Sequence, residues 1–467
     1  MNDIPLTITE AAAALRAGTI TSVELTRELY FRANRLDSAL GCYLYRTAEG
    51  AMAAAGEADS KFAAGIDLGP LQGIPIGVKD IIATDDAPTT ANSVVTPEAL
   101  SAAGDGPVMK RLRAAGAVIM GKVVTSEYAC GMPDAAKPFP IPRNPWDVSR
   151  SPGGSSSGTG VGVAAGFFLG GLGTDTGGSI RIPAAWCGTS GIKPTFGRVP
   201  KSGVAPLGYS FDHLGPLARS ARDCAAMLSV MAGYDASDPA CAAVPVPDYM
   251  AAMTGSVSGL RIGVERKYHL GHPTTEAAVA AAYETAIATL ERAGATVVEI
   301  ELPHYAEISY ATMIGFAGEA MAYHLPDLRT RWADYGRYTS ISLAMAALLS
   351  AGDYVQIARL RSYARKMTAA KMAGLDVLLT PSAGAEAPPA EGLRPELMWD
   401  PGRGLFTPFW NAVGYPAMSI PMGFGANGLP LSLQVVAKPF DEAMAFRVGD
   451  AYQQLTDFHL AVPPIAA

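Results

Sequence analysis

The chain contains few cysteines and histidines, and neither residue forms a pattern typical of a metal site. Its 467 residues include five cysteines and six histidines. The cysteines are odd in number and show no CxxC spacing, which predicts reduced thiols and no zinc site. We therefore expect neither a metal nor an organic cofactor.

Signals for export and for nucleic-acid binding are also missing. The start, MNDIPLTITE, has neither the basic residues nor the apolar run of a secretory signal. A net charge of −7 without a basic stripe argues against nucleic acid as a partner. Residues 151–174 carry no charge, but their many glycines favour a buried helix and strand over a membrane span. The sequence predicts a cytoplasmic protein without a membrane partner.

Apolar residues are abundant: 49% are hydrophobic and 17% charged, which implies a large buried core. Helical and apolar, β-branched segments alternate, which predicts an α/β sheet covered by helices on both faces. We expect one large unit, with a helical segment at 1–65 packed on a catalytic domain at 66–467. Strands are expected at 74–78, 117–120, 260–264, 297–302, 375–380, 418–422 and 431–436, and helices at 108–115 and 274–293.

Two serines lie among glycines between residues 151 and 181. Glycine is favoured where the backbone approaches a ligand closely, so GGS at 153–155 and TGGS at 176–179 each present a hydroxyl on bare backbone. The N–H groups before Ser179 can hold an oxyanion. No histidine can be tied to either serine, which makes a lysine the obvious base. The segment predicts a hydrolase.

Lys79 is the lysine that best fits the role of base. It ends an apolar run at 73–78 that reads as a buried strand. Burial lowers the pKa of an ammonium group and makes the amine a usable base near neutral pH. The alternative is that Lys79 only ends the strand and extends its amine to water.

Other motif interpretations fit their context poorly. Residues 154–158 match the GxSxG elbow, but the preceding segment, 147–152, is polar and ends in proline instead of forming a strand. Residues 160–165 match a loose dinucleotide fingerprint, again with no strand before them.

Four motifs follow one another in a fixed order. They are GVKD, SPGGSSSG, GTDTGGSIRIPAAWCG and GIKPTFGRVP, between about residues 71 and 200. Weaker matches continue at 212–220 and 414–434. This set resembles the amidase signature family. The resemblance implies an α/β fold with a mixed central β-sheet and helices on both faces.

The resemblance also implies a role for each motif residue. Lys79 matches the base, Ser155 the bridging serine that follows a cis peptide and relays protons, and Ser179 the nucleophile. The product of the attack is an acyl-enzyme, or a carbonate or carbamoyl ester if the substrate is a carbamate. The expected oxyanion donors are the N–H groups of Thr176, Gly177 and Gly178, and the expected supporting residues are Asp175, Arg181 and Ser156. Asp175 and Arg181 either hold the nucleophile turn or form an ordinary buried ion pair.

The substrate is less well determined by the sequence. Candidate pocket residues are Tyr128, Cys130, Gly131, Met132, Phe409 and Trp410. Methionines and tyrosines at 300–350 suggest an adaptable apolar wall. These features favour an apolar or aryl amide, anilide or carbamate (urethane), cleaved by a monomer or homodimer.

Two alternatives remain open. One is a glutamine amidotransferase subunit that works within a complex, and the other is a catalytically silent scaffold. Amidotransferase members of the family usually carry an acidic residue before a Phe-Thr pair, where this chain has Leu405. That departure weakens the first alternative, and the intact set of Lys79, Ser155 and Ser179 argues against the second.

Overall fold

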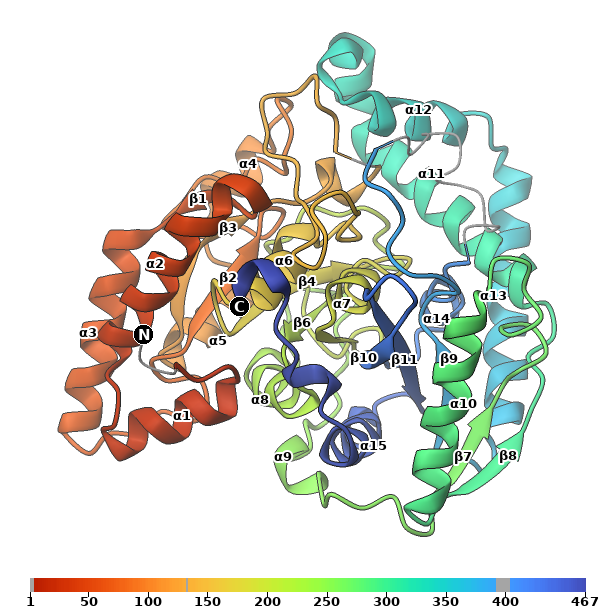
Figure 1. The fold of residues 1–467 in the computed structure, drawn as a ribbon. Coiled ribbons are helices and arrows are strands. Elements are labelled where there is room, and N and C mark those ends of the chain that lie inside the picture. Colours follow the sequence, from red (N-terminus) through yellow and green to blue (C-terminus); the bar gives the residue numbers. More distant parts are fainter. Residues whose placement is uncertain (1–3, 132, 392–403) are drawn as a thin grey trace.

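One mixed β-sheet of eleven strands runs through the protein, in the order β1-β3-β2-β4-β6-β5-β10-β11-β9-β7-β8. The computed structural model describes residues 4–131, 133–391 and 404–467. Figure 1 shows the sheet surrounded by helices. The strands are β1 (Tyr43–Arg46), β2 (Pro75–Lys79), β3 (Val118–Val123), β4 (Gly170–Asp175), β5 (Ser190–Lys193), β6 (His213–Ala218), β7 (Arg261–Val264), β8 (Thr296–Glu299), β9 (Val377–Pro381), β10 (Ala417–Phe424) and β11 (Pro430–Ala437).

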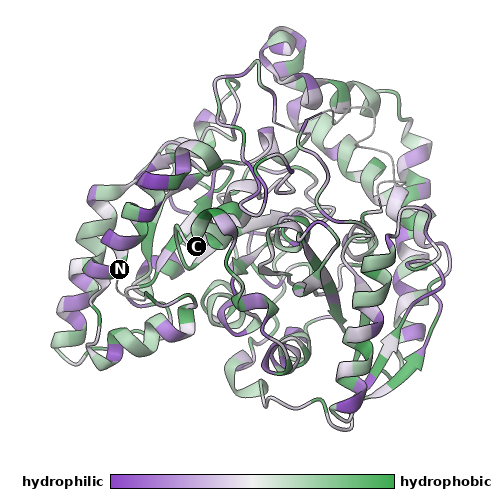
Figure 2. Ribbon diagram, in the orientation of Figure 1, coloured by the Kyte–Doolittle hydropathy of each residue, from purple (hydrophilic) through white to green (hydrophobic). Residues whose placement is uncertain are grey.

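Helices enclose this sheet on its two faces, as the sequence predicts (Figure 1). Figure 2 shows apolar colour along the strands and a mixture of polar and apolar stripes on outer helices such as α2 and α3. The helices are α1 (Ile8–Ala17), α2 (Ser22–Leu40), α3 (Ala48–Ala63), α4 (Glu98–Ala103), α5 (Pro107–Ala114), α6 (Ser157–Ala165), α7 (Arg181–Cys187), α8 (Ala221–Met231), α9 (Tyr249–Ala252), α10 (Ala277–Arg292), α11 (Tyr305–Arg331), α12 (Arg337–Ala346), α13 (Ala351–Met372), α14 (Pro408–Val413) and α15 (Glu442–Leu455).

The sheet is parallel in two places, around β2 and around β7. β2 pairs in parallel with β3 and β4, and β7 with β8 and β9, whereas the other neighbours are antiparallel. Parallel strands are buried on both faces and read as continuous apolar runs. β2 and β3 are buried at every position. This is why both were visible in the sequence as uninterrupted apolar segments.

The N-terminal segment contains a strand that the sequence analysis missed. Helices α1 and α2 begin with capping boxes at Thr7 and Thr21 and end at glycines with positive φ. Between α2 and α3, however, β1 pairs with β3 at the edge of the sheet. The segment at 1–65, expected to be helical and packed on the core, therefore also contributes a strand to the central sheet.

Close packing around β2 places the catalytic elements. A Cβ on Gly77 would lie 2.6 Å from the ring of Phe168, so glycine allows the α6–β4 connection to pack on the strand. α6 and β4 follow as the sequence predicts for residues 151–174. The carboxyl end of β2 then lies beside the carboxyl end of β4, and these two ends carry Lys79 and Asp175.

Among the described helices, none alone has the length and hydropathy to cross a membrane. α12 and α13 satisfy those criteria only when taken together, and they meet at a bend of 92°.

Candidate active site

Three hydroxyl groups surround the amine of Lys79, which is fully buried. Its Nζ donates to Ser155 Oγ at 2.7 Å, to Ser156 Oγ at 3.0 Å and to Thr174 Oγ1 at 2.8 Å. The alternative that Lys79 reaches water at the end of its strand is thereby excluded. Burial lowers its pKa to about 7, although the charges of Asp175 and Asp212 act in the opposite direction.

The serine motif supplies Ser155 from a turn just before α6. The Gly154–Ser155 peptide bond is cis, as the family resemblance implies. The Ser155 carbonyl accepts hydrogen bonds from Ser126 N at 3.2 Å and from Thr125 Oγ1 at 2.9 Å. Ser156 N in turn donates to the Ser179 carbonyl at 3.2 Å. These bonds hold the two serine segments against each other.

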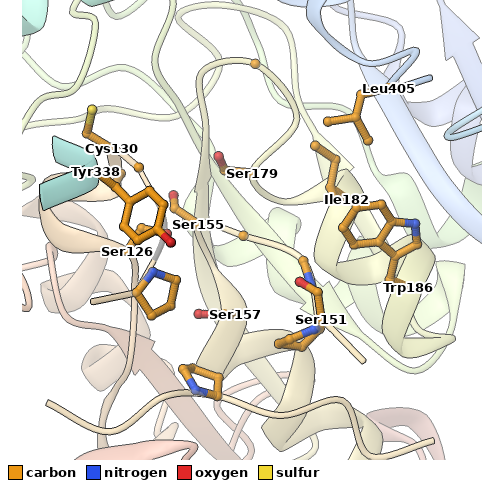
Figure 3. A pocket seen from close by; sticks show the side chains of 18 of the residues that line it. Ser126, Cys130, Ser151, Ser155, Ser157, Ser179, Ile182, Trp186, Tyr338 and Leu405 are labelled. Carbon is orange, nitrogen blue, oxygen red and sulfur yellow. The ribbon is translucent and has the colours of Figure 1, made fainter. Parts of the chain in front are cut away.

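Figure 3 shows the Ser155 and Ser179 side chains pointing into the same space. Both serines line one cavity. Within the described part of the chain their hydroxyls are not hydrogen-bonded to each other. Catalytic hydrogen bonds are often loose without substrate, so this arrangement is compatible with the predicted relay.

Asp175 organises the turn that carries Ser179. Its carboxylate accepts from the N–H groups of Gly178 at 2.9 Å and Ile180 at 3.2 Å, and pairs with the guanidinium of Arg181 at 2.8 Å. Burial alone would raise the pKa of this carboxyl, but the charge and hydrogen bonds of Arg181 hold it well below its usual range. Asn411 Nδ2 donates to the same carboxylate at 2.9 Å. The Asp175–Arg181 ion pair therefore does more than neutralise charge, because Asp175 also fixes the backbone around the nucleophile.

Two of the three predicted oxyanion donors have free N–H groups. No acceptor for the N–H of Thr176, Gly177 or Ser179 occurs among residues 4–131, 133–391 and 404–467. The N–H of Gly178 is instead used by Asp175. The prediction for Gly178 is thus corrected: this glycine accommodates the tight approach of Thr407, whose Oγ1 would clash with an added Cβ.

The cavity at the serines has a volume of about 510 Å³. Figure 3 shows Ile182, Trp186 and Leu405 on one side of the serines and Cys130 and Tyr338 on the other. Met313 and Phe316 of α11 add to its apolar wall. The expectation of an apolar wall from residues 300–350 is met at these positions.

Of the predicted pocket residues, Cys130 and Gly131 line this cavity. Three others do not, and their prediction is wrong. The Tyr128 hydroxyl donates to the Val95 carbonyl at 2.5 Å, so the ring lies in the core. Phe409 and Trp410 are fully buried in the packing of α14. Met132 lies outside the described residues.

Several contributors to the site were missed in the sequence. Thr174 contacts Lys79, Asn411 contacts Asp175, and Thr407 Oγ1 donates to the Gly177 carbonyl at 2.7 Å. Thr176 Oγ1 donates to Asp212 at 2.5 Å. Thr174 precedes Asp175 directly in the GTDTGGS motif, which was an available signal. Thr407 and Asn411 are more than 220 residues away in the sequence, and only the fold brings them here.

A family model described as Amidase matches residues 24–446. The chain belongs to the amidase signature family. The fold, the cis peptide and the hydroxyl cluster around Lys79 agree with that membership. The protein is thus an amidase-family enzyme acting on carbon–nitrogen bonds.

Relatives with different names resemble this chain to a similar degree. A glutamyl-tRNA(Gln) amidotransferase subunit of Chloroflexus aggregans is 40% identical over 99% of this chain and 98% of its own. A putative amidase, AmiD, of Mycobacterium bovis is 39% identical over 98% and 96%. Peptide amidase from Stenotrophomonas maltophilia, a solved structure, has a TM-score of 0.81 at 30% identity, covering 96% of this chain and 98% of that one. Overall identity therefore does not distinguish a free amidase from a component of a complex.

Proposed function

We propose that this amidase is a free-standing serine amidohydrolase that cleaves apolar or aryl amides, anilides or carbamates. The observation that carries the proposal is the apolar side of the cavity at Ser179. Ile182, Trp186 and Leu405 pack together there and face the cavity. An apolar wall favours burial of an aryl or alkyl group and disfavours a charged one.

The proposed acylation step uses the three motif residues together. Ser179 Oγ attacks the carbonyl carbon while its proton passes to Ser155, and Ser155 passes its own proton to Lys79 over 2.7 Å. The oxyanion is held by the free N–H groups at Thr176, Gly177 and Ser179, and each such donor is worth about 100- to 1000-fold in rate. The proton then returns to the leaving amine as the carbon–nitrogen bond breaks.

Deacylation uses the same groups in reverse order. A water molecule attacks the acyl carbon, its proton enters the relay through Ser155, and Ser179 Oγ leaves and is protonated again. A carbamate substrate forms a carbonate or carbamoyl ester on Ser179 in place of the acyl ester. In both cases a neutral Lys79 is required, which its pKa of about 7 provides.

The amidotransferase component is the second candidate, because relatives at 40% identity carry that name. Glutamine-using members of the family usually carry an acidic residue before a Phe-Thr pair, whereas here Gly404 and Leu405 precede Phe406 and Thr407, and Leu405 lines the cavity. An apolar side chain there offers no partner for the ammonium group of glutamine, and a charge placed against it would lose its hydration. This contact favours the free hydrolase.

The purified chain alone tests the proposal. We expect turnover of 4-nitroacetanilide and of an aryl carbamate, no turnover of glutamine, and a single adduct with phenylmethanesulfonyl fluoride by intact mass spectrometry. Ser179→Ala should lose both turnover and adduct while keeping its thermal unfolding curve. Leu405→Glu is the matched variant for substrate choice: it should weaken the anilide reaction. Glutamine turnover by the wild type, or activity only after addition of partner proteins, would contradict the proposal.

A further inference from the structure

A second cavity, of about 250 Å³, also reaches the surroundings of Lys79. It shares only Leu207 with the lining of the cavity at the serines, so this side chain separates the two spaces. At its inner end lie Thr174 and Ile81, which are buried, and at its outer end Tyr209 and Ser237, which are exposed. The second cavity therefore connects the interior with solvent by its own route.

Polar side chains border the second cavity, although most of the surface exposed to it is apolar. The polar residues are Thr174, Lys201, Ser202, Asp212, His213, Ser237 and Asp238. Water enters the part of a cavity that offers it polar partners and room, and one water takes about 30 Å³. The volume of about 250 Å³ is enough for several molecules in a row. We take the second cavity to be hydrated.

The three hydroxyls around Lys79 differ in where their own protons go. Ser156 Oγ donates to the Thr174 carbonyl at 3.2 Å, so its proton is engaged. For the hydroxyl protons of Ser155 and Thr174, the described residues contain no acceptor other than Lys79 itself. Ser155 faces the cavity at the serines, and Thr174 lines the second cavity. Lys79 can thus exchange a proton in two directions.

The reaction leaves one proton on Lys79 at the end of each turnover. Deacylation forms a carboxylic acid in the cavity at the serines. Because its pKa lies below that of the lysine, the acid gives its proton through Ser155 to the Lys79 nitrogen, leaving a carboxylate and an ammonium. The ammonium cannot act as a base, so it must lose this proton before the next attack. Ser155 lines the first cavity, which the carboxylate occupies until it leaves.

We propose that Thr174 and the second cavity form the proton exit of Lys79, a role that rests on the function proposed above. The Lys79 N–H bond breaks as a new O–H bond forms on Thr174. The original Thr174 O–H bond breaks, and that proton passes to a water of the second cavity and on to solvent. Thr174 and Lys79 both end neutral, and no further reactant is needed.

The exit is tested on the full-length protein with 4-nitrophenyl acetate, an activated ester whose acylation step is fast. Stopped-flow absorbance follows 4-nitrophenol release at about pH 8, above the Lys79 pKa of about 7. Thr174→Val removes the hydroxyl at nearly constant volume, and Thr174→Ser keeps it. Ala205→Leu narrows the second cavity, which Ala205 lines, without altering any hydrogen-bond partner of Lys79. The Ser179→Ala variant measures the nitrophenol release that does not depend on the nucleophile.

Wild type and Thr174→Ser should release nitrophenol over many turnovers. Ala205→Leu should release the first equivalent at close to the wild-type rate and then continue about 100-fold more slowly, the low end for loss of a positioned proton-transfer group. Thr174→Val also loses a hydrogen-bond contact of Lys79, so its first turnover should be slowed as well, but its later turnovers should be slowed more. A normal steady state in folded Ala205→Leu, or a Thr174→Val variant slowed equally in its first and later turnovers, would overturn the exit. Wild type that releases no nitrophenol beyond Ser179→Ala would instead refute the hydrolase function itself.

Discussion

The buried amine of Lys79 makes both activity and stability depend on pH in a defined direction. Its pKa is lowered to about 7 by burial. Because the neutral amine is the base, kcat/KM should rise through about pH 7, with about a tenth of the full value at pH 6 and a plateau above about pH 8. Initial rates on 4-nitroacetanilide across this range test the assignment. A flat profile, or activity that falls from pH 6 to 8, would refute it.

The same burial predicts that Lys79 costs stability. A pKa lowered from its usual 10.5 to about 7 corresponds to about 5 kcal/mol, at about 1.4 kcal/mol per pH unit. Between pH 7 and 10.5 the unfolded chain holds a proton that the folded chain has lost, so this contribution to folding free energy becomes more favourable as pH rises. At pH 7 and below, the full cost is present.

Lys79→Met removes the buried amine and tests this cost directly. The variant should be inactive, yet more stable than wild type to urea near pH 7, by at most about 5 kcal/mol. The gain should shrink toward pH 10, where the unfolded wild type also loses its proton. A variant less stable than wild type at neutral pH would show that the three hydroxyl contacts outweigh desolvation, and would contradict the reasoning.

Four further substitutions have defined expected outcomes. Arg181→Met leaves a buried carboxylate without its cation, and should lower the urea unfolding free energy by about 3 to 5 kcal/mol. Gly178→Ala should abolish activity and lower the melting temperature, because φ there is +134° and the new methyl meets Thr407. In Gly177→Ala the new methyl would lie 3.2 Å or more from side chains of α11, so this variant should stay folded. Equal melting temperatures for the two glycine variants would contradict this. Asp212→Asn removes a charge that raises the Lys79 pKa, so the rising limb of kcat/KM should move to lower pH; an unchanged or alkaline-shifted limb would argue against that coupling.

Much of the fold could be predicted because the sequence patterns that indicate its strands and helices lie within short segments. The continuous apolar run at 74–78 predicts a strand buried on both faces, and β2 lies there in the centre of the parallel part of the sheet. β1 was missed because it is four residues long and follows a helical segment. Its partner β3 lies about 75 residues further on, and only that pairing makes Tyr43–Arg46 a strand.

The site shows the same division between local and distant information. Lys79, Ser155 and Ser179 lie within motifs, and a motif identifies a catalytic residue from its sequence neighbours alone, without its three-dimensional surroundings. Pocket walls depend on which face of an element points inward. Phe409 stacks on Tyr305 with ring centroids 4.5 Å apart, and this contact with α11 turns it away from the substrate. An aromatic residue in a sequence suits a core and a pocket equally well.

The wall of the cavity at Ser179, on which the proposed substrate choice depends, also relies on contacts between residues far apart in the sequence. The catalytic groups come from β2, the turn before α6, β4 and the turn that follows β4, all within the first 190 residues. The cavity wall is completed by α11 and by Leu405, which reaches Ile182 and Trp186 across the sequence. The catalytic side chains therefore come from one part of the chain, whereas the cavity wall combines that part with a distant one. Substitutions at Leu405 or in α11 should change which carbonyl compound reaches Ser179 and should leave the Lys79 pH profile in place; a Leu405→Ala variant with a shifted rising limb would show that the two parts are coupled.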